Sequence, residues 1–353
     1  MQNKMKVSLL WIFLALTLTL FTDAFEATSG KKTVSRCSSH FDCSLNGKCV
    51  SGRCYCNPGW KNSKCSELNL LPQKPDYIPA YGYEPNVTSW GGNIIYDEKT
   101  EEYHLFVSEI PGGLREWTKK SRIIHGVSND PLGVFKKKDV VLPAWAHNAA
   151  PVLAPENYDG NKTLPWFVFH IGQGNLHAAS NPNGPWIKLP EFGGCNNPAP
   201  MFHNNGSLYV ACPGRILRAI CAHMGTWEQV SEIKYPYIYG NGMPGITEDP
   251  FLFMDPNNNW HFITHRYNTS QGYPDRYGEI LVSGHAFSEN GIDWKFSSEQ
   301  PYPNYRVYGD NTRKYFATVE RPKLVFNKGG WPAYLVNGVS PIWDQFDPGR
   351  PCS

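Results

Sequence analysis

The segment Thr247-Glu-Asp-Pro-Phe-Leu-Phe253 places a proline and an apolar run after a short polar stretch. Three further segments share this pattern: His147-Asn-Ala-Ala-Pro-Val-Leu153, Asn197-Pro-Ala-Pro-Met-Phe202 and Val319-Glu-Arg-Pro-Lys-Leu-Val-Phe326. Their prolines, at 151, 200, 250 and 322, lie 49, 50 and 72 residues apart. A weaker fifth copy, Ser89-Trp-Gly-Gly-Asn-Ile-Ile-Tyr-Asp97, has Gly92 in the proline position. A repeat of about 50 residues is typical of a β-propeller, whose blades have four strands each.

The residues that follow each segment support this interpretation. A turn and a second strand rich in Tyr, Phe, Val or Leu come next, and helical periodicity is nearly absent. Four third strands also repeat, each ending in Ser or Cys before a turn with glycine, at Ser128, Ser180, Cys221 and Ser288. The sequence therefore predicts an all-β fold, with a five-bladed propeller over residues 81–345.

The first 24 residues have the features of a secretory signal peptide. Lys4 and Lys6 precede an apolar run from Ser8 to Phe21, and small residues follow at 22–24. The run is short for a membrane span, and no later apolar stretch is long enough to cross a bilayer. We therefore expect a secreted protein.

Charge excludes some classes of partner. The formal net charge is +2, which becomes +1 once Lys4, Lys6 and Asp23 are removed. A balance this close to zero gives no reason to expect nucleic acid or an anionic membrane as partner. Four Asn-x-Ser/Thr motifs suit a glycosylated extracellular chain; they begin at Asn86, Asn161, Asn205 and Asn268.

Six cysteines crowd into residues 37–65, at Cys37, Cys43, Cys49, Cys54, Cys56 and Cys65. In an exported chain such density indicates a disulfide framework, because about thirty residues cannot bury a sufficient core. Zinc is the weaker alternative in an oxidising compartment. Spacing alone leaves fifteen pairings open. Cys195, Cys212, Cys221 and Cys352 remain; their even number predicts two further bridges of unknown pairing.

The cysteine spacing, with Cys54-Tyr-Cys56-Asn-Pro-Gly-Trp60, closely resembles an epidermal-growth-factor-like domain. The resemblance implies pairing of Cys37 with Cys49, Cys43 with Cys54, and Cys56 with Cys65. It also implies a module that contacts an extracellular protein partner. Calcium is not expected there, since Lys31-Lys-Thr-Val-Ser-Arg36 replaces the usual acidic pair. Residues 66–80 contain three prolines and little periodicity, which predicts a linker.

Residues at the start of each innermost strand matter most for function, because the inner strands of a propeller converge on one end of its central channel. Groups far apart in sequence are expected to meet there: Trp90-Gly91-Gly92, His147-Asn148, Asn196-Asn197, Glu248-Asp249 and Glu320-Arg321. Carboxyl groups held close together push one pKa upward, which allows an acid and a base to coexist.

The repeat and these strand starts resemble the five-bladed propeller glycoside hydrolases, family 43 most of all, over residues 80–345. The resemblance implies hydrolysis of a glycosidic bond with inversion of configuration. It assigns the general acid to Glu248, in Thr247-Glu-Asp-Pro. The family's base and its second, acid-tuning aspartate are not matched, since Trp90-Gly91-Gly92 and Asn148 occupy their positions.

Two hypotheses follow from the vacant positions. In the first, Asp249 or Glu320 supplies the missing carboxylate, so that the catalytic residues are Glu248, Asp249 and Glu320 and a carbohydrate is the substrate. In the second, the propeller binds glycans without turnover. For Glu320-Arg321 the structural alternative is an internal ion pair. No cofactor is expected, although a structural calcium ion in the propeller channel, as in some relatives, stays open.

Substrate contacts are predicted for Trp90, His147, Asn148, Asn197 and Arg321. Sugar faces stack on aromatic rings, and the chain has 12 Trp and 19 Tyr. Among the candidates Trp90, Trp117, Trp145 and Tyr239, we assign a ligand role to Trp90 and packing to most others. His265-Arg266 is expected to lie too far from the axis for chemistry. His125, His177 and His285 share one repeated position with Arg218, which predicts packing or hydrogen bonding between blades.

Overall fold

The computed structural model describes residues 36–74, 76–172, 174–193, 195–233, 248–265 and 282–340. Nearly all regular structure in these ranges is β, in four four-stranded sheets and several two-stranded ones. The helical elements described are a single turn of α-helix, α1 (Trp117–Lys120), and the 3-10 turns η1 (His40–Cys43), η2 (Leu114–Glu116) and η3 (Ala222–Met224). The all-β prediction is confirmed.

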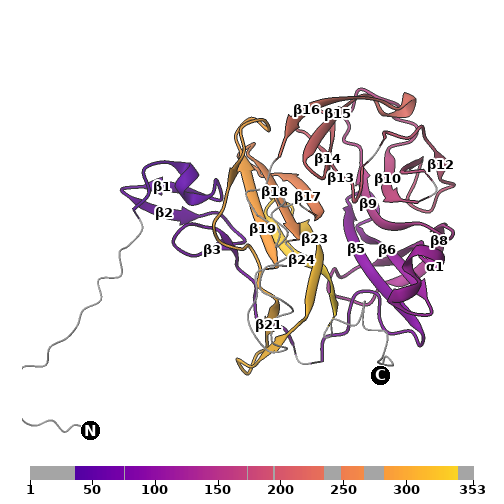
Figure 1. The fold of residues 1–353 in the computed structure, drawn as a ribbon, viewed down its shortest axis with the longest axis horizontal. Helices are drawn as coiled ribbons and strands as arrows, with labels where there is room; N and C mark the ends of the chain where they lie inside the picture. Colours follow the sequence, from indigo (N-terminus) through magenta and orange to yellow (C-terminus); the bar gives the residue numbers. More distant parts are fainter. Residues whose placement is uncertain are drawn as a thin grey trace, which may run out of the picture. The chain divides into compact units, whose positions relative to one another are not determined.

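Each four-stranded sheet is a meander in which consecutive strands pair antiparallel. The strands are, sheet by sheet, β5 (Val87–Asp97), β6 (Glu102–Pro111), β7 (Arg122–Ser128), β8 (Lys136–Leu142); β9 (His147–Leu153), β10 (Trp166–Ile171), β11 (Leu176–Ala179), β12 (Ile187–Lys188); β13 (Ala199–Phe202), β14 (Leu208–Cys212), β15 (Arg215–Cys221), β16 (Thr226–Glu232); β17 (Glu248–Met254), β18 (Trp260–His265), β19 (Ser283–Ser288), β20 (Lys295–Phe296). Figure 1 shows the first strands of these sheets around a common centre, which is the arrangement of a propeller.

The last repeat differs from the other four. Its strands β23 (Thr318–Phe326) and β24 (Pro332–Ser340) form a two-stranded sheet, preceded by the hairpin β21 (Tyr305–Val307) and β22 (Arg313–Tyr315). β23 contacts both β17 and β5, so it lies between the fourth and the first sheet. The prediction of five four-stranded blades is therefore wrong for this repeat: the described residues contain four complete blades. The sequence carries the third-strand motif only four times, once for each complete blade.

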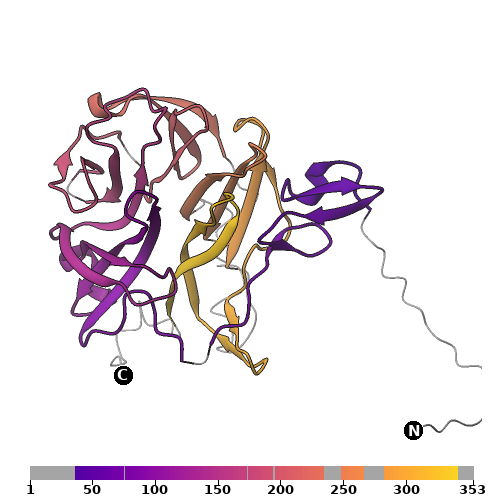
Figure 2. The ribbon, with the colours of Figure 1, turned by 180° about the vertical axis from the view of Figure 1, so that it is seen from behind.

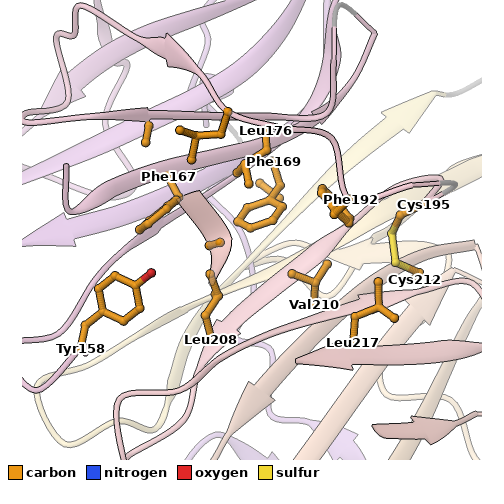
Figure 3. Packing of buried hydrophobic residues seen from close by; sticks show 14 residues of the cluster. Tyr158, Phe167, Phe169, Leu176, Phe192, Cys195, Leu208, Val210, Cys212 and Leu217 are labelled. Atoms are coloured by element: carbon orange, nitrogen blue, oxygen red, sulfur yellow. A yellow bond between two sulfur atoms is a disulfide. The ribbon is translucent and has the colours of Figure 1, made fainter. Parts of the chain in front are cut away.

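Neighbouring blades pack through alternating strand residues. Phe167 and Phe169 of β10 point toward Leu208 and Val210 of β14, as Figure 3 shows. Residues two apart lie on the same face of a strand, so these bulky side chains form a continuous layer. A disulfide between Cys195 and Cys212 closes the end of this layer. Cys221 is a free thiol, and Cys352 lies outside the described residues, so only one of the two further bridges is found.

The N-terminal cysteine-rich region consists of η1 and the short strands β1 (Gly47–Val50), β2 (Arg53–Cys56), β3 (Trp60–Lys61) and β4 (Glu67–Leu68). Three disulfides hold it together: Cys37–Cys49, Cys43–Cys54 and Cys56–Cys65. The pairing implied by the sequence resemblance is confirmed.

This cysteine-rich region is docked on the fourth blade. The Trp60 ring is buried and stacks on His285 and His261, with ring centroids 5.2 and 6.4 Å apart. Figure 2 shows the region beside that blade. Replacing an aromatic ring buried in this way by alanine typically costs about 3–5 kcal/mol. The region is therefore an integral part of the packed structure.

The predicted linker at 66–80 is also bonded to the rest of the chain. The backbone N–H of Leu68 donates to Pro301 O, and that of Gln73 to Val307 O, both at 2.8 Å. Part of its backbone is thus hydrogen-bonded to residues 301 and 307, and its role as a linker and lead-in to the propeller stays a prediction.

Two surface features complete the description. In the part of the chain that the structure describes, no helix has the length and apolar character that crossing a bilayer requires. Asn86, Asn161 and Asn205 are exposed, and Asn268 lies outside the described residues. Glycosylation at these sites stays a prediction.

Candidate functional site

One backbone device recurs at the start of every inner strand. In each short segment at the start of an inner strand, the second residue has a left-handed backbone conformation, with φ between 52° and 64°. These residues are Gly91, Asn148, Asn197, Asp249 and Arg321. In β5, β9, β17 and β23 this residue coincides with a shift of register, as in a β-bulge. Bulges of this kind re-aim side chains. Asn and Asp adopt the conformation more readily than other L-residues, so the sequence favours it at three of the five positions.

These five residues close the axis of the propeller. Asn148 Nδ2 donates to Asn197 Oδ1, and Arg321 Nη1 donates to Asn197 Oδ1 at 3.2 Å and to Asp249 Oδ1 at 2.9 Å. With Lys323 they line a cavity of about 10 Å³, roughly the room of one water molecule. A sugar cannot occupy the axis at this level and must bind outside this ring.

Gly91 is required for the ring to close. Its φ is +64°, and a Cβ atom there would lie 2.5 Å from Cδ of Arg321. A side chain at Gly91 would therefore displace Arg321 from Asp249 and Asn197. Gly91 lies where the family resemblance implies a catalytic aspartate. Glycine is thus needed at this position to make room for the guanidinium group of Arg321.

The first residues of the strand starts form a second, acidic cluster. Glu248 begins β17 and faces His265, the last residue of β18, across the strand pair. Ligand atoms of Glu248, Asp249 and His265 all lie within 4.8 Å of one another, and His265 Nδ1 is 3.6 Å from Asp249 Oδ2. Glu320, on the adjacent strand β23, adds a third carboxyl group whose charge is felt at His265.

The electrostatics of the cluster separate its carboxyl groups. Burial raises the pKa of Glu320, and the nearby charges of Asp249 and Glu248 add to the effect against those of His265 and Arg321. Burial also acts on Asp249, but the charges of Arg321 and of the nearby His265 hold its pKa below the usual range. Although burial opposes it, the nearby charges of Glu320, Asp249 and Glu248 raise the pKa of His265. The pKa values of the two buried carboxyl groups are therefore shifted apart, that of Asp249 downward and that of Glu320 upward.

Metal binding fits this cluster poorly. The ligand types of Glu248, Asp249 and His265 suit a divalent cation. However, Asp249 already forms an ion pair with Arg321, and a metal-bound imidazole must be neutral, whereas the environment favours the cationic form of His265. The second group of suitable residues, Cys37, Cys43 and Cys54, is bound in disulfides. A calcium ion in the channel stays a prediction that nothing here tests.

The structure brings predicted site residues together in two groups, the axial ring and the acidic cluster. Asn148, Asn197, Asp249 and Arg321 lie in the axial ring, and their side chains bond to one another. Asp249 is only 2 % exposed. Its carboxylate is engaged in the ion pair with Arg321 inside the ring, and its predicted catalytic role stays a prediction.

Arg321 forms an internal ion pair, as expected, but its partner is not the residue that was expected. Its salt bridge is with Asp249 of the fourth blade, whereas its neighbour Glu320 was the expected partner. Within the described residues, the Glu320 carboxyl group has no hydrogen bond or salt bridge. The backbone explains the difference, since the left-handed conformation of Arg321 turns its side chain toward the axis.

Trp90 is not placed to stack on a sugar. Its ring is 6 % exposed and packs against Gly338 of β24, where a Cβ atom would lie 2.9 Å from the ring. Trp117 and Trp145 are exposed instead, and both contact His147. Tyr239 lies outside the described residues.

His265 was expected to lie away from the chemistry, and this expectation is wrong. Its position at the end of β18 brings it opposite Glu248. The signal was present in the hairpin pattern, because the end of a second strand always faces the start of the first. Arg266 lies outside the described residues.

The repeated histidines form pairs within blades. His125 bonds to His104, His177 to His170 and His285 to His261, at 2.9, 2.9 and 3.1 Å. Burial lowers the pKa of each of the three repeated histidines, so they are neutral. They thus act in packing, as predicted, but each bonds to the neighbouring strand of its own blade.

Comparisons with known proteins give structural likeness only. No family profile matches the chain, and no protein with a curated description matches it. The structure is similar to an endo-arabinase from Bacteroides thetaiotaomicron VPI-5482, with 15 % identity over 75 % of this chain and 96 % of the other and a TM-score of 0.47. It is also similar to a thermostable family-43 glycoside hydrolase, with 11 % identity, 76 % and 88 % coverage and a TM-score of 0.49. A family 117 glycoside hydrolase from Zobellia galactanivorans shows 12 % identity, 69 % and 78 % coverage and a TM-score of 0.40.

Proposed function

We propose that this chain is a secreted carbohydrate-active protein, a glycoside hydrolase in which Glu248 and Glu320 form the acid–base pair. One observation carries the proposal. Two carboxyl groups from adjacent inner strands lie in one cluster outside the closed axial ring, and the environment raises the pKa of one of them. Separation of two carboxyl pKa values by their environments is how glycosidases assign an acid and a base.

The environments suggest a role for each residue. Glu320, whose pKa burial raises, is the group that keeps a proton to donate to the leaving oxygen. Glu248 is partly exposed and begins its strand, so it is the group better placed to activate a water molecule. This assignment reverses the role of Glu248 that the sequence resemblance implies. An inverting mechanism further requires the two carboxyl groups to lie roughly 6.5–9.5 Å apart.

His265 supports the pair by its charge. It faces Glu248 and interacts with Glu320 and Asp249, and its raised pKa favours the cation. A buried positive charge among three carboxyl groups offsets their mutual repulsion. We propose His265 as a positioning residue that holds Glu248 in place.

Leaving-group dependence tests the two roles separately. Glu320→Gln should lose about 10²–10⁴-fold in kcat on oligosaccharides, because proton donation is lost. It should keep most of its rate on 2,4-dinitrophenyl glycosides, whose leaving group needs no proton. Glu248→Gln should be slow on both substrates. Glu289→Gln, an exposed glutamate on the turn after β19, serves as the matched control. Rates equal to wild type in both cluster variants, on a broad panel of glycosides, would remove the proposal.

Glycan binding without turnover is the second candidate. It is favoured by the axial ring, where Gly91 and Asn148 stand in place of the expected carboxylates and Arg321 neutralises Asp249. Binding on a glycan array by a protein that cleaves none of the bound glycans would establish this alternative.

We further propose that residues 37–65 are an epidermal-growth-factor-like module. Its three disulfides support the assignment, and the four disulfides among the described residues suit an exported protein. Val50 and Tyr55 are exposed on its hairpin and are the residues we propose for contact with an extracellular partner. Loss of partner capture by Tyr55→Ala, with unchanged stability, would test this surface.

A further inference from the structure

We infer that Trp117 and Trp145 form an aromatic platform that binds one sugar ring of a saccharide beside the acidic cluster. The inference deepens the proposed function and rests on it. Among the tryptophans of the described residues, these two alone are exposed, at 44 % and 39 %. Both contact the same side chain, His147, although they come from different elements.

His147 holds the two indole rings in a defined arrangement. Its ring stacks on Trp145 with centroids 5.2 Å apart at 22°, and meets the edge of Trp117 at 4.9 Å and 88°. Ser121 Oγ lies 3.4 Å from His147 Nδ1 and fixes the imidazole ring. Burial and the charge of Arg321 lower the pKa of His147 to about 3, so the support is neutral and apolar.

Glycine provides the space for Trp145. A Cβ atom at Gly172, after β10, would lie 2.3 Å from the backbone oxygen of Trp145 and 2.7 Å from its ring. A side chain at Gly172 would therefore displace the Trp145 ring, which now stacks on His147 and is partly exposed to solvent. Such a preformed surface loses little conformational entropy when a ligand binds.

The platform lies next to the proposed catalytic site, because the histidine that supports it is the sequence neighbour of a residue in the axial ring. His147 precedes Asn148, which donates to Asn197 in the axial ring, where Arg321 also bonds. The electrostatic effect of Arg321 and Asp249 on His147 shows the same proximity. The axial cavity is too small for a sugar, so a ligand near His147 would lie outside the ring, where the two indole rings are exposed.

The chemistry of the platform fits a sugar ring. An indole face combines apolar area with a quadrupole that attracts the polarised C–H groups on one face of a sugar. Trp145 lies at 22° and Trp117 at 88° to the same imidazole, so the two indole rings offer one face and one edge, which suits a single sugar ring. This sugar would occupy the position next to the one cleaved.

Affinity electrophoresis in gels that contain arabinan, xylan or galactan tests the inference without requiring turnover. Trp145→Ala and Trp117→Ala should each weaken retardation by about tenfold or more, as expected when one aromatic anchor is removed. Trp145→Phe keeps a ring and should retain most of the binding. Tyr83→Ala removes an exposed aromatic ring from the segment before β5 and is the matched control.

The outcomes separate the platform from the proposed catalysis. Saccharide binding that both tryptophan variants keep overturns the platform, even if the wild type hydrolyses glycosides. Binding that needs the tryptophans, in a protein without hydrolytic activity, supports the platform and refutes the hydrolase. A wild type that binds none of the three polysaccharides and hydrolyses none of their oligosaccharides overturns both. Where hydrolysis is seen, the tryptophan variants should raise KM and change kcat little.

Discussion

Glu109 and Glu320 are two glutamates with side chains removed from solvent, and their surroundings differ completely. Glu109, on β6, receives Nε of Arg122 and Nζ of Lys137, each at 2.5 Å, and the Tyr81 hydroxyl at 2.7 Å. Burial would raise its pKa, but these partners together hold it below the usual range. For Glu320 burial prevails, and its pKa is raised.

The difference teaches that burial does not by itself assign a function to a carboxyl group. The buried carboxylate of Glu109 has two cationic partners and a hydroxyl donor, so all its charge is compensated. Its role is to join β6, β7, β8 and the segment before β5. A buried carboxyl group without such partners favours its neutral form and can act as an acid. Asp249 belongs with Glu109, since Arg321 keeps it ionised.

The largest effect on stability is expected for Asp249→Asn. It leaves the guanidinium group of Arg321 in the axial ring without its counter-charge, which typically costs about 3–5 kcal/mol. Urea unfolding with the disulfides intact measures this loss. The double variant Asp249→Asn/Arg321→Met should recover part of it, because both charges are gone. A loss below about 1 kcal/mol in the single variant would contradict the pairing.

Smaller changes in stability are expected when the two glutamates are replaced, and the changes should be of opposite sign for Glu109 and Glu320. Glu109→Gln breaks charged hydrogen bonds to Arg122 and Lys137, both partly exposed, and should cost about 1–3 kcal/mol at pH 7. Glu320→Gln replaces a carboxyl group whose charged form is disfavoured by burial, so the free energy of unfolding should stay unchanged or rise. Equal losses in both variants would show that the two environments are alike.

The smallest effect is a difference in pH dependence. The pKa of Glu320 is raised above its ordinary value of 4.5 in the folded state, so its carboxyl group destabilises the fold when charged. This penalty is absent below pH 4.5 and grows as pH rises through the folded-state pKa. The stability advantage of Glu320→Gln over wild type should therefore be present at pH 7 and vanish toward pH 4.

For Glu109 the sign is reversed. Its pKa is lowered in the folded state, so its contribution is present above pH 4.5 and is lost as pH falls through the folded-state pKa. The disadvantage of Glu109→Gln should hence disappear only in stronger acid. Unfolding curves of the three proteins between pH 3 and pH 8 check both signs, and curves that stay parallel to wild type would contradict them.

Much of the fold was predictable because repeats and cysteine spacing are local features of sequence. The strand starts were aligned correctly, since Gly91, Asn148, Asn197, Asp249 and Arg321 share one conformation. The prolines were aligned less well. Pro198, Pro250 and Pro322 follow the left-handed residue directly, whereas Pro151 and Pro200 lie further along their strands. Proline suits several strand positions, so its presence alone does not fix the register.

The pairing of the site residues was not predictable. Glu109 carries no local signal, because its partners lie 13 to 28 residues away, on β7, on β8 and in the segment before β5. The burial of Trp90 depends on Gly338, about 250 residues away, and the pairing of Asp249 depends on Gly91 leaving room for Arg321. Such contacts follow from the closure of the propeller, which sequence patterns indicate only in outline.

Direct titration of the two glutamates tests the central claim. In protein labelled with ¹³C at the Glu side-chain carboxyl carbon, the signals of Glu109 and Glu320 are assigned by their loss in the Glu109→Gln and Glu320→Gln variants. The Glu320 signal should titrate above pH 4.5 and the Glu109 signal below it. A Glu320 carboxyl group that titrates below 4.5 would contradict its role as the proton donor.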